Sequence, residues 1–192
     1  FTLWHDLEEC FPGFNVLNHA FGGSHLSDCL HFFDRLVVPV RPRAIVLYAG
    51  DNDLDFGARP EDVRDRLKDF MERKRRAFGE EVPVTYVSIK ISPARFHIMF
   101  KIGYTNYIIK KYVAQQPDLD YLDITRRMIS HGRLKLLDYY SEDPLHMNPA
   151  GYRIWGASLC EHLEQLHRAI GPLRDERPLE IGGSPAPCAA AQ

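Results

Sequence analysis

The feature that most constrains the fold is a set of short apolar runs separated by longer helical patterns. The runs are rich in Val, Ile, Leu and Tyr and are nearly continuous, which is typical of strands covered on both faces. They span residues 14–21, 44–50, 84–89 and 119–124. Strands that alternate with helices indicate parallel pairing through right-handed crossovers. We therefore expect an α/β fold, a three-layer α/β/α sandwich around a parallel sheet.

The helical patterns carry recognisable end signals. Apolar residues recur at three- and four-residue spacing over 25–37, 60–78, 96–114 and 149–168. Pro60 is expected in the first turn of the second helix, and Gly79 follows its end. Asn148 is expected to cap the last helix, with Pro149 in its first turn.

The chain opens with a helical pattern, whereas an α/β chain of this kind usually opens with a strand. Leu3, Trp4, Leu7 and Phe11 share one face of the expected helix. This order suggests that a strand preceding Phe1 is missing from the sequence. If so, runs 14–21 and 44–50 should flank a gap one strand wide, or roughly 9–10 Å.

Length and composition fit one folded domain followed by a tail. The chain has 192 residues, which suits a single core, and we expect a domain over residues 1–170. Residues 171–192 are rich in Pro, Gly and Ala and are expected to form a flexible tail. We expect a soluble protein, cytoplasmic, or exported if a signal lies upstream of Phe1.

Charge and cysteine spacing exclude several partners. The net charge of −2 leaves no basic excess, so no nucleic-acid partner is expected. No apolar run approaches the roughly 20 residues of a membrane helix, so no membrane span is expected. The four cysteines show neither C-x-x-C pairing nor zinc-ligand spacing, so no metal is expected. The sequence does not indicate which oligomeric state the protein adopts.

Three segments lie where an open parallel sheet places its ligands, after a strand or before the last helix. Gly22-Gly23 follows the first run and leaves a backbone N–H unshielded by side chains. Asn52, after the second run, offers two uncharged N–H donors. Asp143 and His146 stand three residues apart, so the carboxylate can fix the imidazole tautomer. Taken alone, each segment could also be a turn, a cap or a chance pair.

Taken together, the three segments resemble the SGNH hydrolases, also called GDSL esterases and lipases. They read NHAFGGSHLSD (18–28), LYAGDNDL (47–54) and SEDPLHMNPAGY (141–152). The resemblance spans about residues 1–168. It implies the family's flavodoxin-like sheet, hydrolysis of a small-molecule acyl ester through a Ser-His-Asp triad, and no metal or cofactor.

The resemblance also implies a role for each matching residue. His146 would be the general base, and Asp143 would orient it. The backbone N–H of Gly23 and the side-chain amide of Asn52 would be two donors of the oxyanion hole, with Gly22 as the close rival of Gly23.

The sequence departs from the family pattern at the nucleophile. The family's serine opens the first helix, so we expect it within a few residues before Phe1, and no serine of residues 1–192 is expected to replace it. The 192-residue chain is therefore expected to be inactive. The alternative is a non-catalytic binding relic of the same fold. A flavodoxin-like nucleotide binder is disfavoured, because no phosphate-cradling glycine loop is present.

Overall fold

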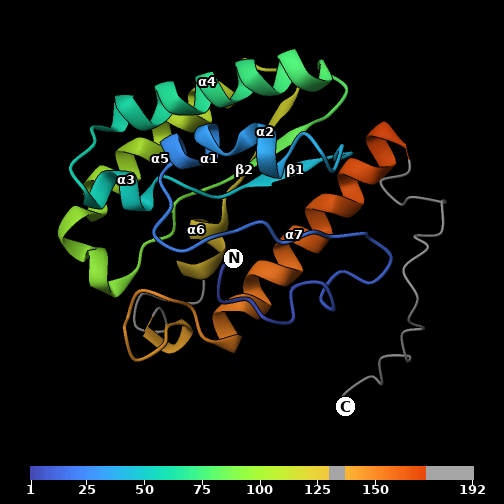
Figure 1. Cartoon of the computed structure of the whole chain (residues 1–192). Coiled ribbons are helices and arrows are strands. Elements are labelled where there is room, and N and C mark those ends of the chain that lie inside the picture. Colours follow the sequence, from blue (N-terminus) through green and yellow to red (C-terminus); the bar gives the residue numbers. More distant parts are fainter. Residues whose placement is uncertain (130–136, 172–192) are drawn as a thin grey trace.

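The computed structural model describes residues 1–129 and 137–171, arranged in three layers (Figure 1). The middle layer is a parallel sheet of three strands in the order β1-β2-β3. These strands are Ile45–Leu47, Val84–Val87 and Leu119–Leu122. All three lie within runs that were predicted as strands, and the α/β fold class is confirmed. The predicted tail lies outside the described residues except for Gly171.

Helices cover both faces of the sheet, with α4 and α5 on one side and α6 and α7 on the other (Figure 1). The first side comprises α1 (Leu26–His31), α2 (Phe33–Leu36), α4 (Pro60–Phe78) and α5 (Met99–Val113). The second side comprises α6 (Ile124–Ile129) and α7 (Pro149–Ile170). Each side has its own buried cluster, one around Phe33 and Phe70 and the other around Trp4 and Trp155.

The predicted helix ends are accurate where a cap or a proline marks them. Helix α4 begins at Pro60 and is followed by Gly79 as its C-cap. Asn148 caps α7, because its Oδ1 accepts the backbone N–H groups of Ala150 (2.9 Å) and Gly151 (3.1 Å). The predicted helix 25–37 is divided into α1 and α2.

Two further elements complete the described chain. Helix α3 spans Asp51–Asp55 directly after the first strand. A 3₁₀ segment, η1 (Pro93–Ile98), precedes α5, so the predicted helix 96–114 starts in tighter turns than expected. Among the described helices, none combines the length and the apolar character needed to cross a membrane.

The prediction of a strand over residues 14–21 is wrong. This segment forms no strand, and Leu17 is 55% exposed. Side chains hold it instead of a ladder of backbone bonds. The Asn18 amide donates to the carbonyl of Phe1 (3.3 Å), and His19 Nδ1 donates to the carbonyl of Leu36 (2.8 Å). An apolar run becomes a strand only if a neighbouring strand accepts its backbone bonds, and no described strand lies beside this one.

The expected N-terminal helix is also absent, although its buried face is present. Trp4, Leu7 and Phe11 are buried as their spacing indicates, but Leu3, which was expected on the same face, is 43% exposed. The backbone forms successive turns, for example from the N–H of Trp4 to the carbonyl of Phe1 (2.9 Å). Bonds of this three-residue span satisfy single turns but do not build a continuous α-helical ladder.

Candidate active site

Asn52 is positioned by the turn that joins β1 to α3. Gly50 in this turn has φ +117°, a conformation that favours glycine. A Cβ at Gly50 would lie 2.9 Å from Val63 Cγ1 and 3.0 Å from Ile89 Cδ1. The close approach therefore requires glycine, and it sets α3 at the carboxyl end of β1, with Asn52 in its first turn.

The glycine segment and Asn52 are joined directly. Asn52 Nδ2 donates a hydrogen bond to the carbonyl of Ser24, 2.9 Å away, which ties α3 to the turn formed by Gly22 and Gly23. Gly23 has φ +69°, and no atom lies within 4 Å of a Cβ built there. A ligand would therefore meet no protein atom on the side of Gly23 where a Cβ would stand.

Asp143 and His146 form the expected pair. Asp143 Oδ2 accepts a hydrogen bond from His146 Nδ1, and its Oδ1 accepts the backbone N–H groups of Leu145 (3.1 Å) and His146 (2.9 Å). The bond from the imidazole, followed by that from the His146 backbone, lowers the pKa of Asp143 to about 2. With Nδ1 held by the carboxylate, Nε2 is the ring nitrogen that can take a proton.

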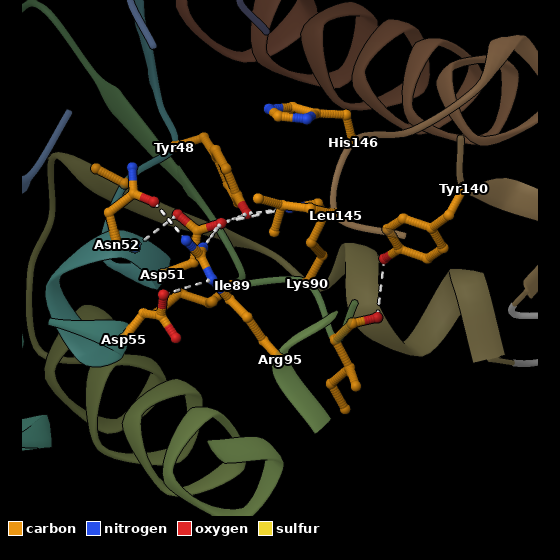
Figure 2. A network of polar contacts seen from close by, with 12 residues as sticks. Tyr48, Asp51, Asn52, Asp55, Ile89, Lys90, Arg95, Tyr140, Leu145 and His146 are labelled. Carbon is orange, nitrogen blue, oxygen red and sulfur yellow. Dashed lines mark hydrogen bonds and ion pairs between the residues drawn. The ribbon is translucent and has the colours of Figure 1, made fainter. Parts of the chain in front are cut away.

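The loop that carries this pair is anchored at both ends. Tyr140 pairs with Met147 in an isolated antiparallel bridge, and the Tyr140 hydroxyl donates to the carbonyl of Ile91 (2.8 Å; Figure 2). Asn148 Nδ2 donates to the carbonyls of Asp138 (2.8 Å) and Tyr140 (3.1 Å). The His146 loop is thus attached both to the start of α7 and to the chain that follows β2.

One cavity of about 590 Å³ brings the predicted residues together. Its lining includes Gly22, Gly23, Asn52 and His146, whereas Asp143 stands behind His146 and is not part of the lining. Figure 2 shows the His146 ring extending from its loop toward the side of the site that holds Asn52. Residues from three distant parts of the sequence therefore face a common space.

The same cavity continues along β1. Its lining contains all of residues 14–24 and 40–49, and the second range includes β1 itself. In the described chain β1 pairs only with β2, so the cavity separates the free side of β1 from segment 14–21. No direct pairing joins this segment to β1, although the segment is not the strand that was expected to border the gap.

A buried charged network lies beneath Asn52, and the sequence analysis did not single it out (Figure 2). Asp51 Oδ2 accepts a hydrogen bond from the Tyr48 hydroxyl (3.0 Å) and forms ion pairs with Lys90 Nζ (3.3 Å) and an Arg95 terminal nitrogen (2.7 Å). Asp51, Lys90 and Arg95 are only 6–8% exposed. Lys90 follows the predicted run 84–89 directly, so its place at a strand end was a usable signal.

The charges in this network stabilise one another. Burial opposes ionisation of Asp51, but the positive charges of Lys90 and Arg95 outweigh it and lower the pKa of the carboxyl. Burial lowers the pKa of Lys90, and the Asp51 carboxylate offsets part of that shift. The network therefore keeps a carboxylate ionised directly under the candidate donor Asn52.

Phe1 also lies in the lining of the cavity. Its ring stacks on Trp4, with centroids 6.0 Å apart, and meets Trp155 edge-on at 5.5 Å. Phe1 shares this lining with Asp51 and Lys90. Among the described residues, no group of three or more His, Cys, Asp or Glu side chains is placed to hold a metal ion.

Comparisons with known proteins identify the family and the fold. The sequence profile of the GDSL-like Lipase/Acylhydrolase family matches residues 3–154. A search among curated proteins finds no significant match. Solved structures with a similar fold include a lipase/acylhydrolase from Enterococcus faecalis, with a TM-score of 0.64, 19% identity, and coverage of 75% of this chain and 72% of that one.

Two further structures share the fold. A carbohydrate esterase family 3 protein from Talaromyces cellulolyticus has a TM-score of 0.66 at 19% identity, covering 78% of this chain and 70% of its own. A GDSL-like lipase from Bacteroides thetaiotaomicron has a TM-score of 0.63 at 22% identity, covering 75% of this chain and 73% of its own. At these identities the likeness concerns the fold.

Proposed function

The chain belongs to the GDSL-like lipase/acylhydrolase family, and we propose that the protein hydrolyses a small-molecule acyl ester through a Ser-His-Asp triad. The observation that carries the proposal is the convergence of Gly23, Asn52 and His146 on one cavity, with Asp143 bonded to the far side of the imidazole. The His146–Asp143 pair and the two donors are both required, because acyl transfer needs a base and oxyanion donors around one carbonyl.

In the proposed mechanism, His146 is the general base. Its Nδ1 is engaged by Asp143, so Nε2 takes the proton of the attacking hydroxyl. The carboxylate then stabilises the imidazolium that forms. The low pKa of Asp143 supports this role, because the carboxyl stays ionised wherever the imidazole is neutral and able to act as a base.

Gly23 and Asn52 are the proposed oxyanion donors. As the serine oxygen bonds to the carbonyl carbon, the carbonyl oxygen becomes negative and accepts hydrogen bonds from the Gly23 N–H and from Asn52 Nδ2. The tetrahedral intermediate expels the alcohol, which takes the proton from His146. Water, deprotonated by His146, then attacks the acyl-serine and releases the carboxylic acid.

We propose that the nucleophilic serine is joined to this chain on the N-terminal side of Phe1. Two observations support this position. Phe1 lines the cavity together with Lys90 and Asp51, so a residue bonded to its backbone nitrogen would lie at or in the cavity. The cavity also continues beside the free side of β1, where an additional strand leading to that residue would find hydrogen-bond partners.

The test compares two proteins on p-nitrophenyl acetate. One is the 192-residue chain, and the other is the same chain extended by the upstream residues that its gene encodes. We expect hydrolysis only from the extended protein, and replacement of its upstream serine by alanine should abolish the reaction.

Two contrary results would redraw this proposal. Hydrolysis by residues 1–192 that Ser24→Ala or Ser27→Ala abolishes would place the nucleophile inside the chain. The other contrary case is a gene that encodes an upstream strand carrying no serine. If that extended protein binds esters but does not hydrolyse them, the result would support a non-catalytic binding relic of the same fold.

A further inference from the structure

We propose that Arg95 is a positioning residue that fixes the Asn52 amide with its Nδ2 toward the cavity. The inference rests on the proposed function, in which Asn52 is an oxyanion donor. Arg95 lies in η1, after β2, and only 7% of its side chain is exposed. Its guanidinium reaches α3 from below, so that it meets Asn52 on the side away from His146 (Figure 2).

All three guanidinium nitrogens of Arg95 face acceptors on α3. One terminal nitrogen donates to Asn52 Oδ1 (2.6 Å), and the other pairs with Asp51 Oδ2 (2.7 Å). Arg95 Nε lies 3.6 Å from Asp55 Oδ2. Because the two acidic residues hold the planar fork, the nitrogen that meets Asn52 has little freedom to move away.

This contact determines which way the Asn52 amide faces. A guanidinium carries donors and no acceptor, so only the amide oxygen can be turned toward it. A reversed amide would set N–H groups against N–H groups and lose the 2.6 Å hydrogen bond. Figure 2 shows the oxygen of Asn52 turned toward Arg95 and the nitrogen turned away from it.

The amide nitrogen is held as well. One hydrogen of Asn52 Nδ2 is directed to the carbonyl of Ser24 (2.9 Å). An amide nitrogen carries a second hydrogen, and Asn52 lines the cavity together with Gly23 and His146. That second hydrogen is the one available to a substrate oxygen. The positive charge of the Arg95 guanidinium beside Oδ1 also polarises the amide, which strengthens Nδ2 as a donor.

Arg95 could also have a purely structural role, which is to attach α3 to η1. A control variant separates this role from the positioning of the Asn52 amide. Arg66 pairs with Asp53, which is also on α3, and makes no contact with Asn52. Arg66→Gln therefore loosens the same helix without releasing the amide. Arg95→Gln removes both the charge and the fork that hold Asn52.

Kinetics of the extended, serine-bearing protein on p-nitrophenyl acetate give the first readout. We expect Arg95→Gln to lower kcat roughly tenfold or more with little change in KM, because an oxyanion donor acts in the transition state. In an Asn52→Ala background the same substitution should cost less than about twofold. Equal losses in both backgrounds, or an equal loss from Arg66→Gln, would overturn the proposal.

Nuclear magnetic resonance of the Asn52 side-chain amide gives a second readout that needs no activity. The two Hδ2 signals, assigned by their loss in Asn52→Ala, should shift in Arg95→Gln and stay in place in Arg66→Gln. If the Asn52 Hδ2 signals do not shift in Arg95→Gln, Arg95 does not position the amide, even if the protein proves to be an esterase. Shifted signals in a protein without esterase activity would uphold the positioning of Asn52 and reject the proposed function.

Arg95→Lys keeps the test decisive if Arg95→Gln does not fold. Lysine retains the charge against Asp51 but has no fork that can reach Asn52 at the same time. We expect the same displacement of the Asn52 signals and the same dependence on Asn52, with a smaller loss of kcat. Wild-type signals and wild-type kcat in Arg95→Lys would overturn the proposal.

Discussion

Asn52 and His146 face one cavity, but the molecule holds them by different means. Asn52 rests on a buried network in which Asp51, Lys90 and Arg95 are each less than a tenth exposed. His146 and Asp143 have side chains that are 46% and 48% exposed, and they depend on bonds within their own loop. The donor side is therefore built into the core, whereas the base side is attached to the surface.

Substitutions on the two sides should therefore have different consequences. A change in the buried network leaves charges without partners and is costly to the fold. A change in the exposed pair alters the chemistry and leaves the core intact.

The largest effect is expected from His146→Ala in the extended, serine-bearing protein. Removal of the base should lower kcat by up to about 10⁶-fold, because the serine would lose the group that takes its proton. The melting temperature should change little, since the side chain is 46% exposed. A large loss of stability in thermal unfolding would show that the loop belongs to the core after all.

Asp143→Asn should lower kcat by about 10⁴-fold, somewhat less than loss of the base. The asparagine can still accept the backbone N–H groups of Leu145 and His146, so the loop should keep its shape. An amide, however, offers donors to Nδ1 and favours the wrong imidazole tautomer. Steady-state kinetics measures the loss, and a variant with wild-type kcat would contradict the assigned role.

Asp51→Ala should reduce the free energy of unfolding by about 3–5 kcal/mol, because Lys90 would remain buried without its counter-charge and Arg95 would keep only its longer ion pair with Asp55. Asp65→Ala is the matched control. Asp65 is 53% exposed and pairs with Lys68, so its loss should cost less than about 1 kcal/mol. Urea unfolding compares the two, and equal losses would remove the distinction between the buried and the exposed side.

Asn52→Ala should lower kcat of the extended protein by about 100- to 1,000-fold, the usual loss for one oxyanion donor. The value of KM should change less, since the donor acts mainly on the charge that develops in the transition state. A rise in KM with unchanged kcat would instead indicate that Asn52 binds the ground state.

The smallest effect concerns acid stability. The folded-state pKa of Asp143 is about 2, below the roughly 3.9 of an unfolded aspartate. Its contribution to folding is therefore complete above about pH 4 and is lost as pH falls toward about 2. Because the side chain is 48% exposed, the contribution should stay below about 1 kcal/mol. Unfolding of Asp143→Ala between pH 5 and pH 2, compared with wild type, measures it.

The sequence predicts best those parts of the fold that local chemistry determines. Pro60 and Gly79 set the ends of α4, and Asn148 sets the start of α7, because caps act on their own backbone neighbours. Segment 14–21 has the composition of a strand but needs a partner strand to become one. Composition cannot supply that partner.

The candidate site divides in the same way. The motifs around Asn52 and His146 can be found in the sequence because the chemistry needs those residue types at fixed local spacing. Arg95 has no such motif. Its partner Asn52 lies 43 positions away, and only the packing of η1 under α3 brings them together. A strand-end rule applied to β2 would have indicated Lys90, but not the orientation of Arg95.

The cap at the start of α7 helps to decide where a dye or a surface linker can be attached to this protein. Asn148 binds the end of the His146 loop to a helix of 22 residues, which is about 33 Å long. The far end of that helix, at Gly171, lies about two turns beyond Leu163, the last residue of α7 that lines the cavity. A dye or a surface linker fixed there would follow the axis of α7, and rotation of the label would report motion of the helix that follows the His146 loop.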